Sequence, residues 1–250
     1  MSFRLLSFSC GQSHDARFDE SLIELAGENG PSACVWESAQ GLVVPRTYKR
    51  FDAFPAACEH FAQQGWPITV RQSGGGIVPQ GPGILNLSLA YAVQGKPLDH
   101  SDEAYLLICK LISDALQDYG IATHPQAVEG SFCDGRYNLA VDSGEAARKV
   151  AGTAQLWRRH ANVDTGITAQ IVLVHALILA AVDIDAVTAR ANDFEQVLDS
   201  GKRYASNRIA SLHDLCETPF PSKEMFTLSL KDSLKHQLTR PEITCEKVSE

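Results

Sequence analysis

Residues 70–86 of this 250-residue chain read VRQSGGGIVPQGPGILN. A strand-like run at residues 67–72 leads into three consecutive glycines, Gly74–Gly76, and a second alternating run follows at residues 84–91. Glycines expose backbone amides and, without a Cβ, let a ligand approach the main chain closely. The stretch therefore predicts a strand, a ligand-binding loop and a second strand, although glycine runs also form plain flexible turns.

The rest of the chain alternates clusters of strands with helices. Further strands are expected at residues 3–8, 33–37, 42–45, 137–141, 149–157 and 167–179. Helices are expected at residues 15–26, 56–64 and 101–119, and again beyond residue 183. The third helix is expected to begin at Ser101, whose hydroxyl can cap it. This order favours an α+β fold with a central mixed sheet over a parallel, doubly wound sheet.

Composition excludes several classes of protein. The net charge of −8 argues against coating nucleic acid or an anionic membrane, because both need a basic face. Seven scattered cysteines without metal-ligand spacing predict a reducing, cytoplasmic setting and no metal site. The N-terminus lacks the features of a signal peptide. The uncharged run at residues 165–182 alternates and contains His175, so a buried strand is favoured over a membrane-spanning helix.

Two further segments contain residues that can carry chemistry. Residues 130–139 read GSFCDGRYNL, with Cys133 in an expected loop, and residues 148–155 read RKVAGTAQ. A reactive thiol needs thiolate, which nearby positive charge favours. If the strands at 137–141 and 149–157 pair as a hairpin, Lys149 returns close to Cys133. The plain alternative is a half-buried cysteine and a solvated lysine.

In this order, the motifs R-x-S-G-G-G…G-P-G-x-L-N, C-x-G-x-Y-N-L and R-K-V-A-G-T-A-Q resemble the biotin/lipoate protein ligase superfamily. The resemblance is greatest to its lipoate branch, which holds lipoate–protein ligases and cysteine-dependent octanoyl- or lipoyl-transferases. It covers roughly residues 22–182 and implies a central mixed sheet flanked by helices. It further implies an acyl-transfer catalytic domain at residues 1–182 and a helical C-terminal extension packed on it at residues 183–250.

The resemblance also implies a set of site residues. Cys133 would be the nucleophile, and Lys149 would stabilise the acyl carbonyl. The acyl chain would thread under the glycine loop. The residues implied to bind substrate are Arg71, Ser73, Gly74, Gly75, Gly76, Asn86, Gly152, Thr153, Ala154, Gln155 and His175. For His175 a hydrogen-bonded core role is favoured over a catalytic base, whereas Gln155 either orients a carrier lysine or pairs across the sheet.

Two reactions occur on this fold. In the transferase reaction, Cys133 takes an octanoyl or lipoyl group from a donor and passes it to a specific lysine of a lipoyl-domain protein, without a cofactor. Such carriers are the E2 of a 2-oxoacid dehydrogenase or the H protein of glycine cleavage. In the ligase reaction, ATP and Mg²⁺ convert lipoate into lipoyl-AMP, and Cys133 is incidental. A third possibility is a non-catalytic relative that only binds lipoate or an acyl group.

Three features favour the transferase. Cys133 occupies the nucleophile position, Gln80-Gly81 replaces a His-Asp pair typical of the ligases, and only about 68 residues follow Val182 for an accessory domain. Ligases with that domain on a separate chain exist, so length alone decides little. Two departures concern ligand contacts. Val70 stands where the family has a first arginine. Asn138 replaces an acid that assists magnesium and the adenylate in the ligases, which disfavours ATP-dependent chemistry and leaves the binding-only alternative open.

Overall fold

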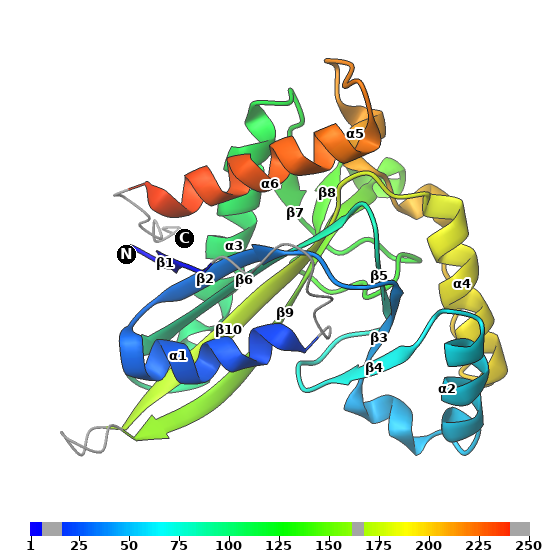
Figure 1. Ribbon diagram of the computed structural model, residues 1–250, viewed down its shortest axis with the longest axis horizontal. Helices are drawn as coiled ribbons and strands as arrows, with labels where there is room; N and C mark the ends of the chain where they lie inside the picture. The colour runs from blue at the N-terminus through cyan, green and yellow to red at the C-terminus, as the bar shows by residue number, and fades with distance from the viewer. Residues whose placement is uncertain (7–16, 162–167, 241–250) are drawn as a thin grey trace.

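The computed structural model describes residues 1–6, 17–161 and 168–240, and its strands form two sheets (Figure 1). Within these residues the larger sheet has seven strands, in which only β1 and β2 run parallel. Their spatial order is β1 (Arg4–Leu5), β2 (Ser32–Trp36), β6 (Ile84–Val93), β10 (Thr168–Leu179), β9 (Arg148–Ala161), β8 (Leu139–Val141) and β7 (His124–Pro125). The predicted α+β fold with a central mixed sheet is confirmed.

The smaller sheet carries the glycine loop. It consists of β4 (Ile68–Arg71), β3 (Gly41–Pro45) and β5 (Val78–Gln80), with β3 in the middle. The loop containing Gly74–Gly76 joins β4 to β5. Two helices, α2 (Phe54–Gln63) and α4 (Ile184–Val197), share an apolar core with this sheet and lie beside it in Figure 1. The strands expected at residues 33–37 and 42–45 both form, but the chain passes from the larger sheet to the smaller one between them.

Helices cover both faces of the larger sheet (Figure 1). The 3₁₀ turn η1 (Phe18–Ser21) and α1 (Leu22–Asn29) lie on one face, where α1 shares a core with Ile171 and Leu173 of β10. On the other face, α3 (Pro97–Gln117) and α6 (Lys223–Thr239) pack against β10 residues of the opposite parity, such as Val172. Successive residues of a strand point to opposite faces, so β10 divides the core into these two layers.

The helix α3 begins earlier than the sequence predicts. It starts at Pro97, four residues before Ser101, and Lys96 precedes its first turn. Proline suits a first helical turn because the missing N–H would have no partner there and the fixed φ is already helical. Ser101 lies in the second turn instead, and its Oγ donates to Gln155 Oε1 (3.1 Å). The prediction of a Ser101 cap is therefore wrong.

The described residues beyond 183 contribute to both cores. Helix α4 places Phe194 in the core of the smaller sheet, and α6 places Phe226 in that of the larger one. Between these helices lie the turn η4 (Ser206–Arg208) and the short α5 (Leu212–Leu215). The intervening chain runs along the Cys133 loop and β9, where the backbone N–H of Ala205 donates to Gly130 O and that of Ala210 to Lys149 O (both 2.9 Å).

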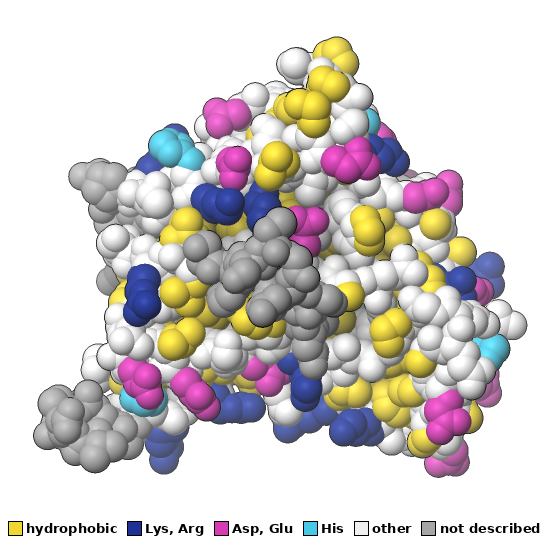
Figure 2. Space-filling view, in the orientation of Figure 1, with side chains coloured by type: hydrophobic (Ala, Val, Ile, Leu, Met, Phe, Trp, Pro, Cys, Tyr) yellow, Lys and Arg dark blue, Asp and Glu magenta, His cyan; other side chains and the backbone are white. Residues whose placement is uncertain are grey.

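Short 3₁₀ turns complete the described chain, namely η2 (Arg46–Arg50) and η3 (Gly144–Ala146). The expected elements at residues 3–8, 15–26 and 167–179 each extend into residues outside the described part. No helix in the described ranges is long and apolar enough to cross a membrane. Charge is unevenly distributed on the face in Figure 2, where several Lys and Arg side chains gather along the lower edge, beneath α1 and the smaller sheet.

Candidate active site

Arg71, the last residue of β4, holds the glycine loop from within. Its buried guanidinium donates from Nη2 to Gly74 O and Gly76 O (2.9 Å each) and from Nε to Gly74 O (3.3 Å). Gly75 has a φ of +105°, and a Cβ there would lie 2.7 Å from Cys133 Sγ. Only glycine lets the loop lie this close to the cysteine.

Cys133 lies in a tight loop that Lys149 and Asn138 hold in place. Its φ of +54° is in the left-handed region, which costs energy for a residue with a side chain. Asn138 Nδ2 donates to Cys133 O (2.9 Å). Lys149 Nζ donates to Phe132 O (2.5 Å) and to Cys133 O (2.9 Å). The hairpin expected from the sequence forms between β8 and β9 and returns Lys149 to this loop.

The charges at this loop favour a thiolate. Burial raises the pKa of the Cys133 thiol, but the positive charges of Lys149 and Arg71 and a hydrogen bond from the Gly76 amide outweigh it, and the pKa lies below its ordinary value. Lys149 is fully buried, which lowers its pKa to about 8 although the nearby Cys133 opposes the shift. Lys149 is therefore able to give and take a proton near neutral pH.

Gly152 makes room for the Lys149 side chain. A Cβ at position 152 would lie 2.5 Å from Lys149 Nζ and 2.8 Å from its Cε. No side chain larger than hydrogen fits unless the amine moves. The glycine in the R-K-V-A-G-T-A-Q motif thus has a steric role toward the lysine three residues earlier.

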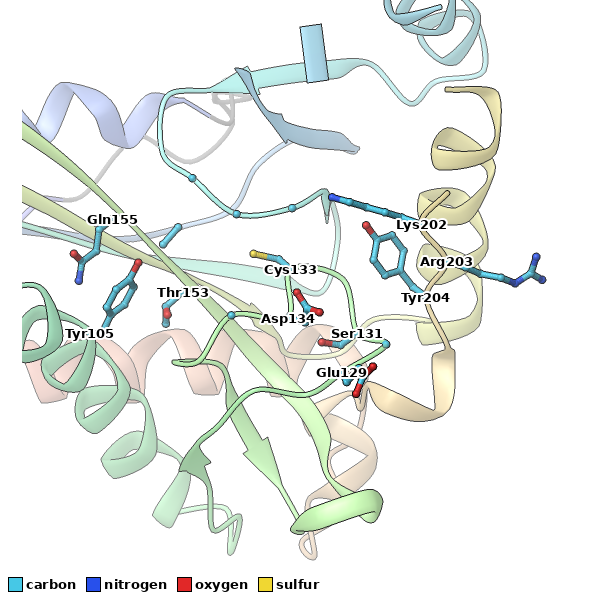
Figure 3. Close-up of a pocket in the computed structure, with 16 residues that line it drawn as sticks. Tyr105, Glu129, Ser131, Cys133, Asp134, Thr153, Gln155, Lys202, Arg203 and Tyr204 are labelled. Atoms are coloured by element: carbon cyan, nitrogen blue, oxygen red, sulfur yellow. The ribbon is translucent and has the colours of Figure 1, made fainter. Parts of the chain in front are cut away.

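Two cavities meet at Cys133. An outer cavity of about 600 Å³ is lined by residues of the glycine loop, the Cys133 loop, α3, β9 and the segment after α4. These are Gly74–Gly76, Tyr105, Glu129–Ser131, Cys133–Gly135, Thr153–Gln155 and Lys202–Tyr204. In Figure 3, Cys133 lies between Thr153 and Tyr105 on one side and Tyr204 on the other, and Arg203 points away. An inner pocket of about 40 Å³ lies behind it and is lined by Trp36, Val43, Arg71, Val78, Gln80, Asn86, Cys133, Gly152, Thr153, Ala154, His175, Ala176 and Leu177.

The register of the larger sheet explains the floor of the inner pocket. Directly paired residues of neighbouring antiparallel strands point to the same face. One row across β2, β6, β10 and β9 consists of Trp36, Asn86, Leu177 and Gly152. The next row consists of Cys34, Ser88, His175 and Ala154. Several residues expected to bind substrate thus share one face because of strand pairing.

The remaining predicted site residues have partners within the protein. Asn86 and Gln80 form a reciprocal amide pair (2.8 and 3.0 Å). Gln155 donates to Ser101 O (2.6 Å) and accepts from Ser101 Oγ and Trp157 Nε1, so its amide is held against α3 and its own strand. His175 lies between Asp19 and Ser73, and Ser73 is buried.

The structure also brings to the site three residues that no sequence motif marks. Asp19 contacts His175 from η1, and Tyr105 of α3 and Tyr204 line the outer cavity. Tyr204 lies beyond residue 183, in the segment expected to be an extension. The sequence contains no motif that marks these positions, which all lie outside the segments at residues 70–86, 130–139 and 148–155.

Solved lipoate–protein ligases share this fold. A lipoate–protein ligase A bound with ATP matches with a TM-score of 0.66 at 16% identity, over 95% of this chain and 84% of that one. A bi-partite lipoate protein ligase from Thermoplasma acidophilum matches with a TM-score of 0.61 at 16% identity, over 95% and 82%. At these identities the similarity establishes the fold alone.

A family model and named relatives, together with the fold, place the chain in the biotin/lipoate protein ligase superfamily, in its lipoate branch. More narrowly, residues 14–235 match the model of the lipoyl protein ligase A/B catalytic domain, and the chain belongs to that family. The match extends beyond Val182 into α6.

Relatives of known name include transferases. An uncharacterized protein of Cupriavidus necator is 51% identical over 196 residues, which is 78% of each chain. The octanoyl-GcvH:protein N-octanoyltransferase of Kyrpidia tusciae is 33% identical over 149 residues, which is 60% of this chain and 50% of that enzyme. The chain thus spans about half the length of this named transferase.

Proposed function

We propose that this protein transfers an octanoyl or lipoyl group, through a thioester on Cys133, to a specific lysine of a lipoyl-domain protein. The observation that carries the proposal is the setting of Cys133, between two cavities and beside Lys149 and Arg71, with a lowered thiol pKa. Names among the relatives support a carrier protein as the acyl donor, since they are octanoyl-GcvH:protein N-octanoyltransferases.

The inner pocket is the proposed place for the acyl tail. Its walls include Trp36, Val43 and Leu177. Two of its polar side chains, Gln80 and Asn86, are hydrogen-bonded to each other. An apolar acyl tail in the pocket therefore does not leave these two amides without partners. The outer cavity then admits the lysine arm of the carrier.

In the first half-reaction the Cys133 thiolate attacks the acyl carbonyl carbon of the donor. The Sγ–C bond forms, and the bond from this carbon to the donor's heteroatom breaks. Lys149 is the proposed source of the proton that the leaving group takes, since its pKa is about 8. Its positive charge and the glycine-loop amides stabilise the negative charge that develops on the carbonyl oxygen.

In the second half-reaction the acceptor lysine, as a neutral amine, attacks the thioester. The C–N bond forms, the C–Sγ bond breaks and Cys133 leaves as thiolate. The nitrogen loses its extra proton to the Lys149 amine. The proton given in the first half returns, so this cycle consumes neither ATP nor any other cofactor.

Intact mass spectrometry tests the proposal. The protein is incubated with an octanoylated H-protein domain without ATP, and Cys133→Ser is compared with Cys216→Ser, which removes another half-buried free thiol. We expect a thioester adduct in the wild type and in Cys216→Ser but not in Cys133→Ser, and octanoyl transfer when an unmodified lipoyl domain is added. Transfer of lipoate only with ATP and Mg²⁺ would instead support the ligase. Binding without transfer, both with and without ATP and Mg²⁺, would support a non-catalytic protein.

A further inference from the structure

Asp19, His175 and Ser73 form a hydrogen-bonded chain that ends next to the glycine loop. Asp19 Oδ2 lies 2.7 Å from His175 Nδ1, and His175 Nε2 lies 2.9 Å from Ser73 Oγ. The three residues come from η1, the middle of β10 and the turn after β4. Asp19 is 2% exposed and Ser73 3%, whereas His175 lines the inner pocket.

The buried carboxylate sets the direction of these hydrogen bonds. A carboxylate has no proton to give, so His175 Nδ1–H donates to Asp19. In the neutral ring the other nitrogen then accepts, and the Ser73 hydroxyl donates to it. Ser88 Oγ also donates to Asp19 Oδ2 (2.9 Å), and Trp36 Nε1 donates to Ser88 Oγ (3.1 Å). Asp19 is thereby held in place and selects one tautomer of His175.

The location of Ser73 argues against a serine nucleophile. The same order of side chains activates serine in hydrolases, where the hydroxyl faces the substrate. Ser73, however, is absent from the described residues that line the two cavities, whereas Cys133 lines both. The Asp19–His175–Ser73 series therefore presents no hydroxyl to a substrate. It ends instead on the backbone that leads into Gly74.

The turn η1 holds this backbone at a second point. Gln72 N donates to Glu20 Oε1 (3.1 Å), one residue before Ser73. Farther along the loop, Gly75 lies against Cys133 Sγ, and the Gly76 amide hydrogen-bonds to Cys133. A displacement at Ser73 would be transmitted through two peptide units to Gly75 and through three to the amide of Gly76.

We propose that Asp19, His175 and Ser73 are positioning residues that hold the glycine loop against Cys133, so that the Gly76 amide stabilises its thiolate. These three side chains exchange no proton with the substrate and form no covalent bond to it. The inference deepens the proposed function, and it rests on that function only where acyl transfer is the readout.

Ser73→Ala tests the proposal, with Ser113→Ala as its matched control. Ser113 Oγ makes a comparable side-chain hydrogen bond to Thr123 Oγ1 (2.8 Å), but on α3 and away from both cavities. The rate of Cys133 alkylation by iodoacetamide is followed against pH by peptide mass spectrometry, together with the rate of octanoyl transfer. We expect Ser73→Ala to shift the alkylation midpoint to higher pH and to slow transfer about 10- to 100-fold, as small misplacements of reacting groups do.

Two further variants distinguish positioning from mere stability. Ser73→Thr keeps the hydroxyl and is expected to restore most of the wild-type midpoint. Asp19→Asn keeps the side-chain shape and is expected to reproduce the upward shift, which also decides the matter if Ser73→Ala does not fold.

Wild-type midpoints in both Ser73→Ala and Asp19→Asn would overturn the proposal, whatever their stability. A shifted midpoint in a protein whose wild type transfers no octanoyl would instead refute the proposed function and support the positioning role. Alkylation of the thiol needs no acyl substrate, so the two failures are distinguishable.

Discussion

Replacing Gly152 by alanine tests the role of Lys149 without changing Lys149 itself. The added methyl would lie 2.5 Å from Lys149 Nζ and 2.8 Å from its Cε. The amine donates to Phe132 O and Cys133 O, so it cannot keep both bonds and yield to the methyl. We expect it to withdraw from the Cys133 loop by about 1 Å, because van der Waals contact between such atoms needs about 3.5 Å.

The expected consequence follows from the charge of Lys149. Its proximity is one of the causes that lower the pKa of the Cys133 thiol, so withdrawal raises that pKa and reduces the thiolate fraction at neutral pH. Misplacement by about 1 Å costs about 100-fold in rate. The extra methyl destabilises the fold by about 1–3 kcal/mol, which is the usual cost of overpacking.

The assay compares Gly152→Ala with Gly27→Ala. A Cβ at Gly27 would also meet a side chain, the His160 ring at 2.7 Å, but that ring lies on the far part of β9, and neither residue lines the outer cavity or the inner pocket. We expect Gly27→Ala to keep the wild-type alkylation midpoint of Cys133 and the wild-type octanoyl-transfer rate. A wild-type midpoint and rate in folded Gly152→Ala would refute the reasoning.

Three other predictions concern buried polar groups. Between pH 8 and 10.5 the unfolding free energy of the wild type is expected to rise by about 3 kcal/mol relative to that of Lys149→Met. The sign follows because the pKa of Lys149 is about 8 in the folded state and 10.5 in the unfolded state. Burial of the charged amine therefore opposes folding below pH 8 and ceases to do so above pH 10.5. If Lys149 were not buried as an amine, urea unfolding would show the same difference between the two proteins across this pH range. Asn138→Asp replaces the donor to Cys133 O by a negative charge, so we expect a higher thiol pKa and at least tenfold slower transfer, as read from alkylation and transfer rates; unchanged values would exclude a role for this amide. Glu195, a buried residue of α4, accepts hydrogen bonds from the hydroxyls of Tyr48 and Tyr204 (2.5 and 2.6 Å). Glu195→Ala should lower the unfolding free energy by about 2–5 kcal/mol, whereas Glu195→Gln keeps an acceptor and should cost less. Equal losses in urea titrations would argue against this hydrogen-bond explanation.

Much of the architecture around Cys133 could be predicted from local sequence. The glycine loop is visible because only glycine tolerates both a φ of +105° and contact with a sulfur atom. The proximity of Cys133 and Lys149 follows from one hairpin, whose strands are close together along the chain. The start of α3 at Pro97 was missed because a serine followed by acids resembles a capping signal in any context.

The partner of His175 could not be predicted. Asp19 is 156 positions away along the chain, and its contact depends on how η1 and α1 pack on the larger sheet. The outer wall at Tyr204 likewise depends on α4 packing against the smaller sheet, which brings residues beyond 183 beside the Cys133 loop. Such contacts arise because apolar faces of helices and sheets pack together and so decide where these elements meet. The polar residues that this packing brings together follow no hydrophobic periodicity by which the sequence could mark them.

The sequence by itself determined the α+β class and the glycine loop, because both depend on backbone conformation and local pattern. It also predicted that Lys149 lies close to Cys133 if the strands at residues 137–141 and 149–157 pair as a hairpin. The tertiary structure alone decided that the thiol lies where two cavities meet, that Lys149 is buried with a pKa near 8, and that Asp19 supports the loop through His175. These properties depend on burial and on distances between elements remote in sequence, and both exist only once the two sheets and their helices have packed.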